Sequence, residues 1–354
     1  GSGYSSSQGR VYLLDGDEAV YGGDLGNSFL TIEGESSSYL GRGLNDELDM
    51  DGDGISDLFG SYRSGSTNYF WLLYGDSALS GSIPLSDVDA RFSTSGTNDN
   101  IWRHASNTGD LDGDGFEDVV ICDQYHVSSG AFGYASSYIQ VLWGDSVRHS
   151  NSPYVSLSSE ATTLASSAGS QTSGGDGYQF QPVCGIMPDW NGDGKDELWA
   201  FITQSDNASF TGAYVFDGDA DWKNGGIDLD PNADASYFFQ TGTSGALVGF
   251  EEVGDWDGDN ISDVALEFYT DNSGGQVWVA GSQTTPDITY AQRDMIAIVI
   301  GDDELGQSQY GNILASEPGD LNNDGLMDWI ASDFAYAGTN GATNMGGVFL
   351  TFQQ

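Results

Sequence analysis

Five nine-residue stretches of the chain carry oxygen-bearing side chains at alternate positions, following the pattern D-x-D-x-D-G-x-x-D. They are Asp49–Asp57, Asp110–Asp118, Asp189–Glu197, Asp255–Asp263 and Asp320–Asp328. Carboxylates at alternate positions of a tight loop point inward, and Ca²⁺ takes roughly six to eight oxygen ligands of this kind. Each stretch therefore predicts a calcium loop, and the chain predicts about five bound Ca²⁺.

Positions 1, 3, 5 and 9 are expected to bind the ion through side-chain oxygens, and position 7 through its backbone carbonyl, whatever its residue type. The predicted metal ligands are Asp49, Asp51, Asp53, Ile55 and Asp57; Asp110, Asp112, Asp114, Phe116 and Asp118; Asp189, Asn191, Asp193, Lys195 and Glu197; Asp255, Asp257, Asp259, Ile261 and Asp263; and Asp320, Asn322, Asp324, Leu326 and Asp328. Asn191 and Asn322 supply an oxygen without a negative charge, so the third and fifth loops are expected to bind more weakly.

Two other interpretations compete with this one. An EF-hand requires a Glu at position 12 and a helix on each side. Position 12 is Gly60, Ile121, Ala200, Leu266 or Ala331, and none of these can bind a metal through its side chain. Acidic turns without a metal are the second alternative, but the clustered carboxylates would then repel one another.

Apolar, strand-like strings position the loops. One follows each loop directly, as in DLFGSY (57–62) and DVVICD (118–123), and a second comes later in each repeat, as in FWLLYG (70–75) and IQVLWG (139–144). Consecutive loops begin 61, 79, 66 and 65 residues apart. A unit of about four strands repeated about five times predicts an all-β chain, folded as one β-propeller domain over residues 1–354 with about five four-stranded blades.

Two segments depart from this repeat. The polar tract Ser159–Gly177 predicts a surface insertion, and its first part, Glu160–Ala168, is the nearest candidate for a helix. The string RVYLLDG (10–16) precedes the first loop and adds a sixth copy of the second strand. This spare strand suggests either a piece of a longer protein or a homo-oligomer formed by strand pairing.

Charge limits the partners. The 354 residues include 54 acidic and only 9 basic side chains, for a formal charge of −45. This balance excludes nucleic acid and anionic membrane surfaces as partners, because phosphate binding needs Lys and Arg.

No apolar run is long enough to span a bilayer, so we expect no membrane insertion. The start of the sequence lacks a signal-peptide pattern and suggests a mature or trimmed chain. The composition and the calcium requirement predict a secreted or cell-surface location.

The loop, the strands around it and the GxVYVF-like strand that follows resemble the FG-GAP repeat of the integrin α-subunit N-terminal β-propeller. The resemblance covers about residues 10–352. It implies a calcium-binding propeller of an adhesion or extracellular recognition protein, with a protein or glycan ligand. We therefore expect a calcium-stabilised structural, adhesive or self-assembling module.

Catalytic patterns are weak in this sequence. Two of the three histidines fall in the second repeat, where a catalytic pair is conceivable but isolated histidines are the commoner case. Neither a P-loop nor a nucleophile elbow is present, so the sequence predicts no enzyme. A carbohydrate-binding lectin is the first alternative, and a propeller-based polysaccharide lyase or hydrolase is the second. Trp190 and Trp256 are the candidates for exposed aromatic side chains. Cys122 and Cys184 predict either one disulfide or two buried thiols.

Overall fold

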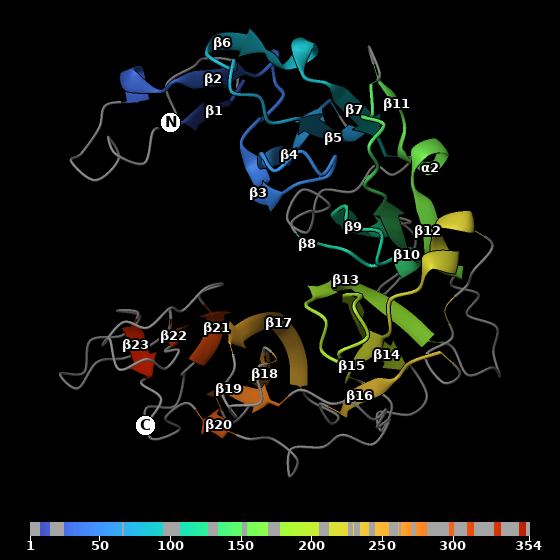
Figure 1. Cartoon of the computed structure of the whole chain (residues 1–354). Helices are drawn as coiled ribbons and strands as arrows, with labels where there is room; N and C mark the ends of the chain where they lie inside the picture. Colours follow the sequence, from blue (N-terminus) through green and yellow to red (C-terminus); the bar gives the residue numbers. More distant parts are fainter. Residues whose placement is uncertain are drawn as a thin grey trace. The chain divides into compact units, whose positions relative to one another are not determined.

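The computed structural model describes residues 8–14, 25–65, 67–94, 107–126, 134–150, 154–168, 178–204, 212–225, 229, 234–240, 245–254, 261, 263–270, 274–281, 297–300, 310–314, 329–333 and 347–351. These residues are mostly in strands (Figure 1). Among the described residues, helices are limited to α2 (Leu157–Glu160) and to short 3-10 turns at Leu25–Asn27, Leu85–Asp87 and Ala220–Asn224. The predicted all-β class is therefore confirmed. Among the described residues, no helix has the length and apolar character needed to cross a membrane.

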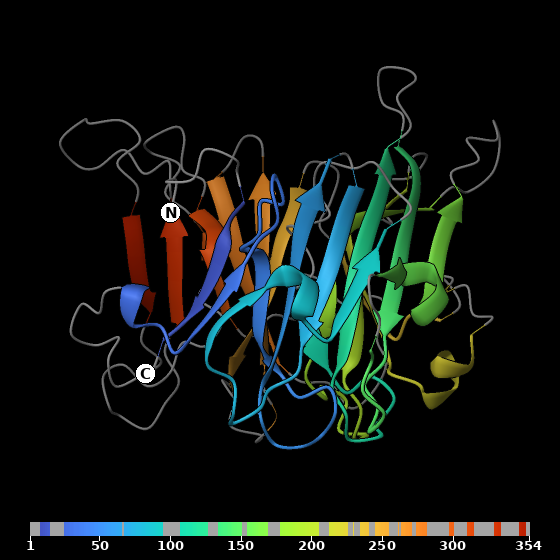
Figure 2. The same cartoon turned by 90° about the horizontal axis from the view of Figure 1, so that it is seen from above.

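Four sheets follow the chain in up-and-down order, so that consecutive strands lie side by side (Figure 2). The first contains β3 (Arg42–Leu48), β4 (Asp57–Ser64), β5 (Thr67–Leu73) and β7 (Ala90–Ser93), with β11 (Val155–Ser156) added parallel to β7. The others are β8 (Asn107–Gly109), β9 (Asp118–His126), β10 (Tyr134–Leu142) and β12 (Thr162–Ala168); β13 (Tyr178–Met187), β14 (Glu197–Gln204), β15 (Gly212–Phe216) and β16 (Tyr237–Gln240); and β17 (Gly245–Gly254), β18 (Asp263–Thr270), β19 (Gly274–Ala280) and β20 (Ala297–Ile300).

Two further sheets have three strands each: β1 (Arg10–Leu13), β2 (Leu30–Glu33) and β6 (Gly81–Pro84); and β21 (Tyr310–Leu314), β22 (Trp329–Asp333) and β23 (Gly347–Thr351). Within the described residues, none of the six sheets closes on itself. In chain order, each D-x-D-x-D-G-x-x-D motif falls between the first and second strands of a sheet. The strand that leaves the loop therefore begins at, or just after, position 9.

The chain divides into two compact units. One comprises residues 1–110, 114–169 and 220–228, and the other residues 111–113, 170–219 and 229–354. The single domain over residues 1–354 stays a prediction. Each unit buries apolar side chains from successive sheets. In the first unit, side chains of β4 and β5 such as Phe59 and Phe70 pack with Val119 and Ile121 of β9. In the second, Trp199 of β14 and Val215 of β15 pack with Val264 of β18.

The strands suit this burial because aromatic and β-branched side chains fill a pleated surface well. Phe59 and Phe70 stack with ring centroids 5.5 Å apart. β15 is buried at all five of its residues, as expected for a strand that is covered on both faces. The loops leave the ends of these buried strands, so the core fixes where each loop begins and ends.

Residues 162–168 are neither the surface loop nor the helix that the sequence predicted. They form β12, which pairs antiparallel with β10 and places Leu164 in the core. The true helix, α2, ends at Glu160. The polar composition of this segment misled the prediction, because the backbone pairing with β10 that makes it a strand does not show in the sequence. Residues 169–177 lie outside the described part of the chain.

The string at Arg10–Leu13, which the repeat count left over, forms β1 and pairs with β2 of the same chain. Val11 is buried with Leu30 and Ile32. The homo-oligomer through this strand stays a prediction. Both cysteines, Cys122 on β9 and Cys184 on β13, are disulfide-bonded, which decides between the two alternatives that the sequence left open.

Candidate metal centre

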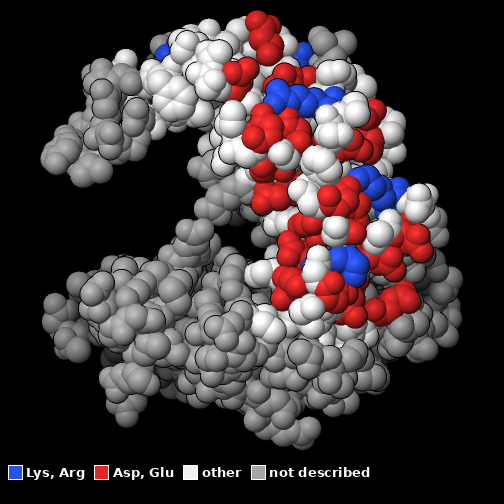
Figure 3. Space-filling view, in the orientation of Figure 1, with Lys and Arg blue, Asp and Glu red and all other residues white. Residues whose placement is uncertain are grey.

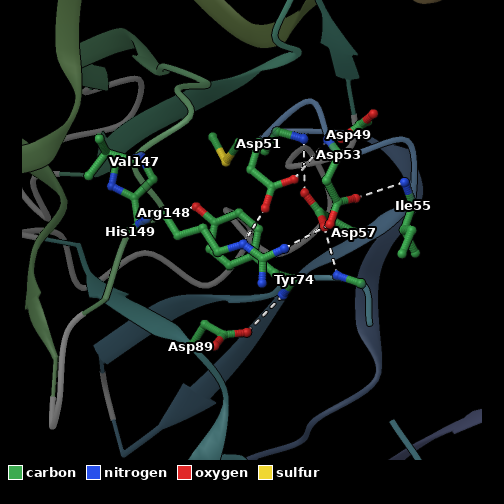
Figure 4. A network of polar contacts seen from close by, with 12 residues as sticks. Asp49, Asp51, Asp53, Ile55, Asp57, Tyr74, Asp89, Val147, Arg148 and His149 are labelled. Atoms are coloured by element: carbon green, nitrogen blue, oxygen red, sulfur yellow. Dashed lines mark hydrogen bonds and ion pairs between the residues drawn. The ribbon is translucent and has the colours of Figure 1, made fainter. Parts of the chain in front are cut away.

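The first loop, Asp49–Asp57, brings three carboxylates together. One oxygen from each of Asp49, Asp51 and Asp57 lies within 4.8 Å of the others (Figure 4). The loop backbone holds them in place. Asp49 accepts hydrogen bonds from the backbone N–H groups of Asp53 (3.1 Å) and Gly54 (2.9 Å), one at each oxygen. The loop therefore curls around its own first side chain.

Asp57, at position 9, is fully buried. Its two oxygens accept backbone hydrogen bonds from Met50 (2.8 Å) and Gly75 (2.7 Å). The pKa of Asp57 is raised to about 6, chiefly by burial and also by the nearby charges of Asp51 and Asp49, while the two hydrogen bonds act to lower it. A buried carboxylate beside two others is a site of concentrated negative charge, which a cation would relieve.

The second loop, Asp110–Asp118, repeats this arrangement. Asp110 accepts hydrogen bonds from the N–H groups of Asp114 (3.0 Å) and Gly115 (2.8 Å), and Gly144 donates to buried Asp118 at 2.8 Å. Oxygens of Asp110, Asp112 and Asp118 lie within 4.8 Å of one another. Two acidic triads can thus each hold a metal ion, and their agreement shows that the motif specifies this local structure.

The third loop, Asp189–Glu197, has the same turn, but the hydrogen bonding at its position 9 differs. Asp189 accepts hydrogen bonds from Asp193 (2.9 Å) and Gly194 (2.8 Å). At position 9, buried Glu197 accepts one from Trp190 at 2.7 Å through Oε2. Its Oε1 is buried and has no hydrogen-bond partner among the described residues. The pKa of Glu197 is raised to about 8, chiefly by burial and also by the charges of Asp189 and Asp217, while the hydrogen bond from Trp190 acts to lower it.

Glycine is required at two positions of each described loop. At position 6, Gly54 has φ +81° and Gly194 +90°; at position 4, Gly52 has φ +70° and Gly192 +78°. L-residues with a side chain rarely adopt these angles. The motif D-x-D-x-D-G-x-x-D specifies glycine at position 6 but not at position 4, although Gly52, Gly113, Gly192 and Gly258 stand at position 4 of four loops.

Basic side chains at the loops were also missed. Arg148 pairs with Asp51 and Asp53 of the first loop. Lys223 pairs with Asp114 of the second loop at 2.8 Å, and Lys195 with Asp193 of its own loop at 2.7 Å. On the described part of the face in Figure 3, a few basic groups lie among many acidic ones. The chain has only 9 basic residues, and both Arg148 and Lys223 come shortly after a copy of the repeated second strand. This recurrence could have indicated their role from the sequence.

The remaining predicted ligands are only partly described. Ile261 is described, and Asp263 is fully buried like Asp57. The structure does not describe the other members of the fourth and fifth loops or Trp256. These loop members are Asp255, Asp257, Asp259, Asp320, Asn322, Asp324, Leu326 and Asp328.

Trp190 is described, and the prediction of an exposed aromatic there is wrong. It is 1% exposed and packs against Tyr237 and Phe239, because position 2 of the loop faces the core.

The donor atoms indicate what kind of ion would fit. All six side chains of the two acidic triads offer carboxylate oxygens. Oxygen ligands suit hard cations such as Ca²⁺, Mg²⁺ or Mn²⁺. Neither histidine nor cysteine takes part in the two acidic triads. These residues therefore fit a hard divalent cation.

Comparison with known proteins adds little. No family model matches the chain, and no curated protein matches it. One similar solved structure carries a title describing an engineered GH43 glycoside hydrolase with endo-xylanase and exo-arabinofuranosidase activity. The match has 10% identity and a TM-score of 0.27, and it covers 66% of this chain and 39% of that one.

The sequence predicted no enzyme, and this match contradicts that prediction because the protein in its title is a glycoside hydrolase. The statement that the chain has no enzymatic activity therefore does not stand. A match with so low a TM-score carries no argument for a particular activity, so no catalytic role is assigned to any residue.

Proposed function

We propose that this chain is a calcium-stabilised protein whose D-x-D-x-D-G-x-x-D loops each bind one Ca²⁺. The observation that carries the proposal is the convergence of carboxylate oxygens within 4.8 Å in both the first and the second loop. Separate stretches of sequence with one motif build one arrangement, as expected for a repeated ligand set.

Calcium suits the loops better than magnesium. Positions 1, 3, 5, 7 and 9 offer more oxygens than the one or two protein carboxylates that Mg²⁺ commonly takes along with its waters. The loops also curl as an irregular turn, whereas Mg²⁺ demands near-octahedral geometry. Position 9 is held rigidly, because Asp57 and Asp118 accept backbone hydrogen bonds from Gly75 and Gly144, which follow β5 and β10.

The role that we assign to calcium is structural. Each loop joins the first and second strands of a sheet, so a bound ion would fix the turn between them and stabilise the folded state. The four up-and-down sheets are compatible with blades of a propeller of the FG-GAP kind. We assign the chain to that architecture as part of this proposal.

The setting that we propose is extracellular, where calcium is abundant and disulfides persist. The disulfide bonding of Cys122 and Cys184 supports this setting. In it, the chain would serve as a structural or adhesive surface module that contacts a protein or glycan ligand. The burial of Trp190 removes one of the two candidates for an exposed aromatic side chain, and with it part of the case for a lectin.

Thermal unfolding of the full chain tests the metal role. We expect Ca²⁺ at millimolar concentration to raise the melting temperature by roughly 10 °C or more over the value in EDTA, because several sites that bind only the folded state contribute together. Mg²⁺ at the same concentration, as the control, should raise it much less. Equal melting temperatures in Ca²⁺ and in EDTA would contradict the proposal.

A further inference from the structure

Arg148 reaches the first loop from far along the chain. Its Nη2 lies 2.9 Å from Oδ2 of Asp53, and its Nε donates to Oδ2 of Asp51 (Figure 4). These carboxylates stand at positions 5 and 3 of the loop. The side chain of Asp51 is only 4% exposed, whereas that of Arg148 is 42% exposed. The guanidinium thus covers the outer side of a predicted ligand set.

The placement of Arg148 is built into the fold. Its guanidinium carbon lies 4.8 Å from the centroid of the Tyr74 ring, and the next residue, His149, donates its N–H to the Tyr74 hydroxyl at 2.8 Å. Earlier in the same segment, Asp145 donates its N–H to the carbonyl of Met50 in the first loop at 3.0 Å. The segment 144–149 is therefore held on the first loop by backbone contacts as well as by Arg148.

The same device recurs one repeat later. Lys223 follows β15 as Arg148 follows β10, and its Nζ lies 2.8 Å from Oδ2 of Asp114, at position 5 of the second loop. It also donates to the carbonyl of Gly144 at 3.1 Å. Two basic side chains from corresponding segments thus meet the corresponding carboxylate of the preceding loop. This repetition argues that the pairing is a feature of the repeat.

A fixed positive charge beside a cation site has two consequences. Without a metal ion, it neutralises part of the carboxylate cluster and stabilises the loop. With a metal ion, it repels that ion, because like charges only a few ångströms apart at a partly buried site interact strongly. The forked guanidinium also competes for the ligand oxygens directly, since Arg matches carboxylate geometry well.

We infer that Arg148 places a permanent positive charge beside the carboxylates of the first loop. This charge sets the affinity of the loop for Ca²⁺, and when no ion is bound it holds the segment 144–149 on the loop. The inference rests on the proposed function, since it presumes that the first loop binds Ca²⁺. It adds a residue outside the nine-residue motif to the determinants of binding, and it makes affinity differ between loops of identical motif.

The test replaces Arg148 in the full chain and measures calcium binding by competition with a chromophoric chelator, together with the melting temperature in EDTA. Arg148→Gln should tighten one binding step about tenfold and lower the metal-free melting temperature by about 2 °C. Arg148→Lys keeps the charge but loses the fork, so its affinity should fall between those of Arg148→Gln and the unchanged chain.

The matched control is Arg10→Gln. It removes the same charge from an ion pair between Arg10 and Glu33 on β1 and β2, at 2.9 Å. It should leave every binding step unchanged, which separates a local effect from the general effect of net charge.

The outcomes separate the two proposals. If the unchanged chain binds Ca²⁺ and Arg148→Gln binds it with equal or weaker affinity at every step, Arg148 is an ordinary ion pair and the inference is wrong. If Arg148→Gln alone binds Ca²⁺, the inference is supported. If neither protein binds Ca²⁺, the proposed function itself fails, and the inference fails with it.

Discussion

The first and third loops share a turn and differ in what surrounds it. In both, the carboxylate at position 1 accepts the N–H groups of positions 5 and 6. In the first loop, both oxygens of Asp57 accept backbone hydrogen bonds, and Arg148 neutralises the outer carboxylates. In the third, Glu197 keeps one oxygen without a partner among the described residues. The motif thus fixes the turn, whereas its neighbours fix the charge balance.

This difference predicts different dependence on a metal ion. A buried carboxylate with satisfied oxygens is stable as a structural element by itself, while an unpaired buried carboxylate oxygen is costly until a cation or a proton meets it. We therefore expect the first loop to hold its shape without calcium, and the third loop to gain more from calcium than its neutral Asn191 would suggest.

Asp57→Asn should produce the largest effect. The amide keeps one acceptor but turns an NH₂ group toward the N–H of either Met50 or Gly75, so a buried hydrogen bond is lost and two donors face each other. The free energy of unfolding should fall by about 2 to 3 kcal/mol in EDTA, and by at least as much in Ca²⁺. Urea denaturation measures both values. A loss seen only in Ca²⁺ would show that Asp57 serves the ion alone.

Glu197→Gln should act in the opposite sense without metal. The amide oxygen can still accept from Trp190, and above pH 8, where Glu197 of the metal-free protein is ionised, the unpaired negative charge disappears. We expect the metal-free protein to gain about 1 kcal/mol and the stabilisation by Ca²⁺ to shrink. Urea denaturation in EDTA and in Ca²⁺ checks the two signs. A variant that is less stable than the unchanged chain in EDTA would contradict the contrast with Asp57.

The turn itself should behave alike in both loops. Gly54 and Gly194, both at position 6, have positive φ, and a Cβ at either would meet nothing within 4 Å. Backbone strain is thus the only cost, and Gly54→Ala and Gly194→Ala should each cost about 1 kcal/mol. Gly52→Ala should cost more than either, because a Cβ at Gly52 would lie 2.8 Å from the Phe116 ring. Equal effects at Gly52 and Gly54 would show that the ring yields freely.

Lys195→Gln should have the smallest effect. Lys195 pairs with Asp193 within one loop, and both side chains are partly exposed, at 28% and 39%. Such a pair contributes at most about 0.5 kcal/mol, and salt should reduce this further. Melting temperatures at low and high salt measure it. An effect as large as that of Arg148→Gln would mean that position 7 also balances the charge of the loop.

Much of the fold could be read from the sequence. The strings DLFGSY (57–62) and FWLLYG (70–75) each became a strand, because alternating or continuous apolar residues between turns favour strands strongly. Residues 162–168 could not be read correctly. Their serines and threonines look like a loop, and only the pairing with β10 makes them a strand. Trp190 was misjudged because the burial of position 2 depends on the core beneath the loop.

The candidate site could be read in part. Ligand positions follow from the motif, because residues at alternate positions of one short turn share a side whatever the tertiary structure is. Arg148 lies 97 residues from Asp51, and Lys223 lies 109 from Asp114, so only the fold brings each pair together. The unpaired oxygen of Glu197 was likewise beyond the sequence, since it depends on which backbone groups reach it.

Native mass spectrometry of the full chain, titrated with Ca²⁺ and with Mg²⁺, tests the central claim most directly because it counts bound ions. The account predicts about five Ca²⁺ per chain, one fewer in a variant that combines Asp110→Asn with Asp112→Asn, and little uptake of Mg²⁺ at equal concentration. A chain that takes up no Ca²⁺ beyond nonspecific adducts, or a count that this variant leaves unchanged, would contradict it.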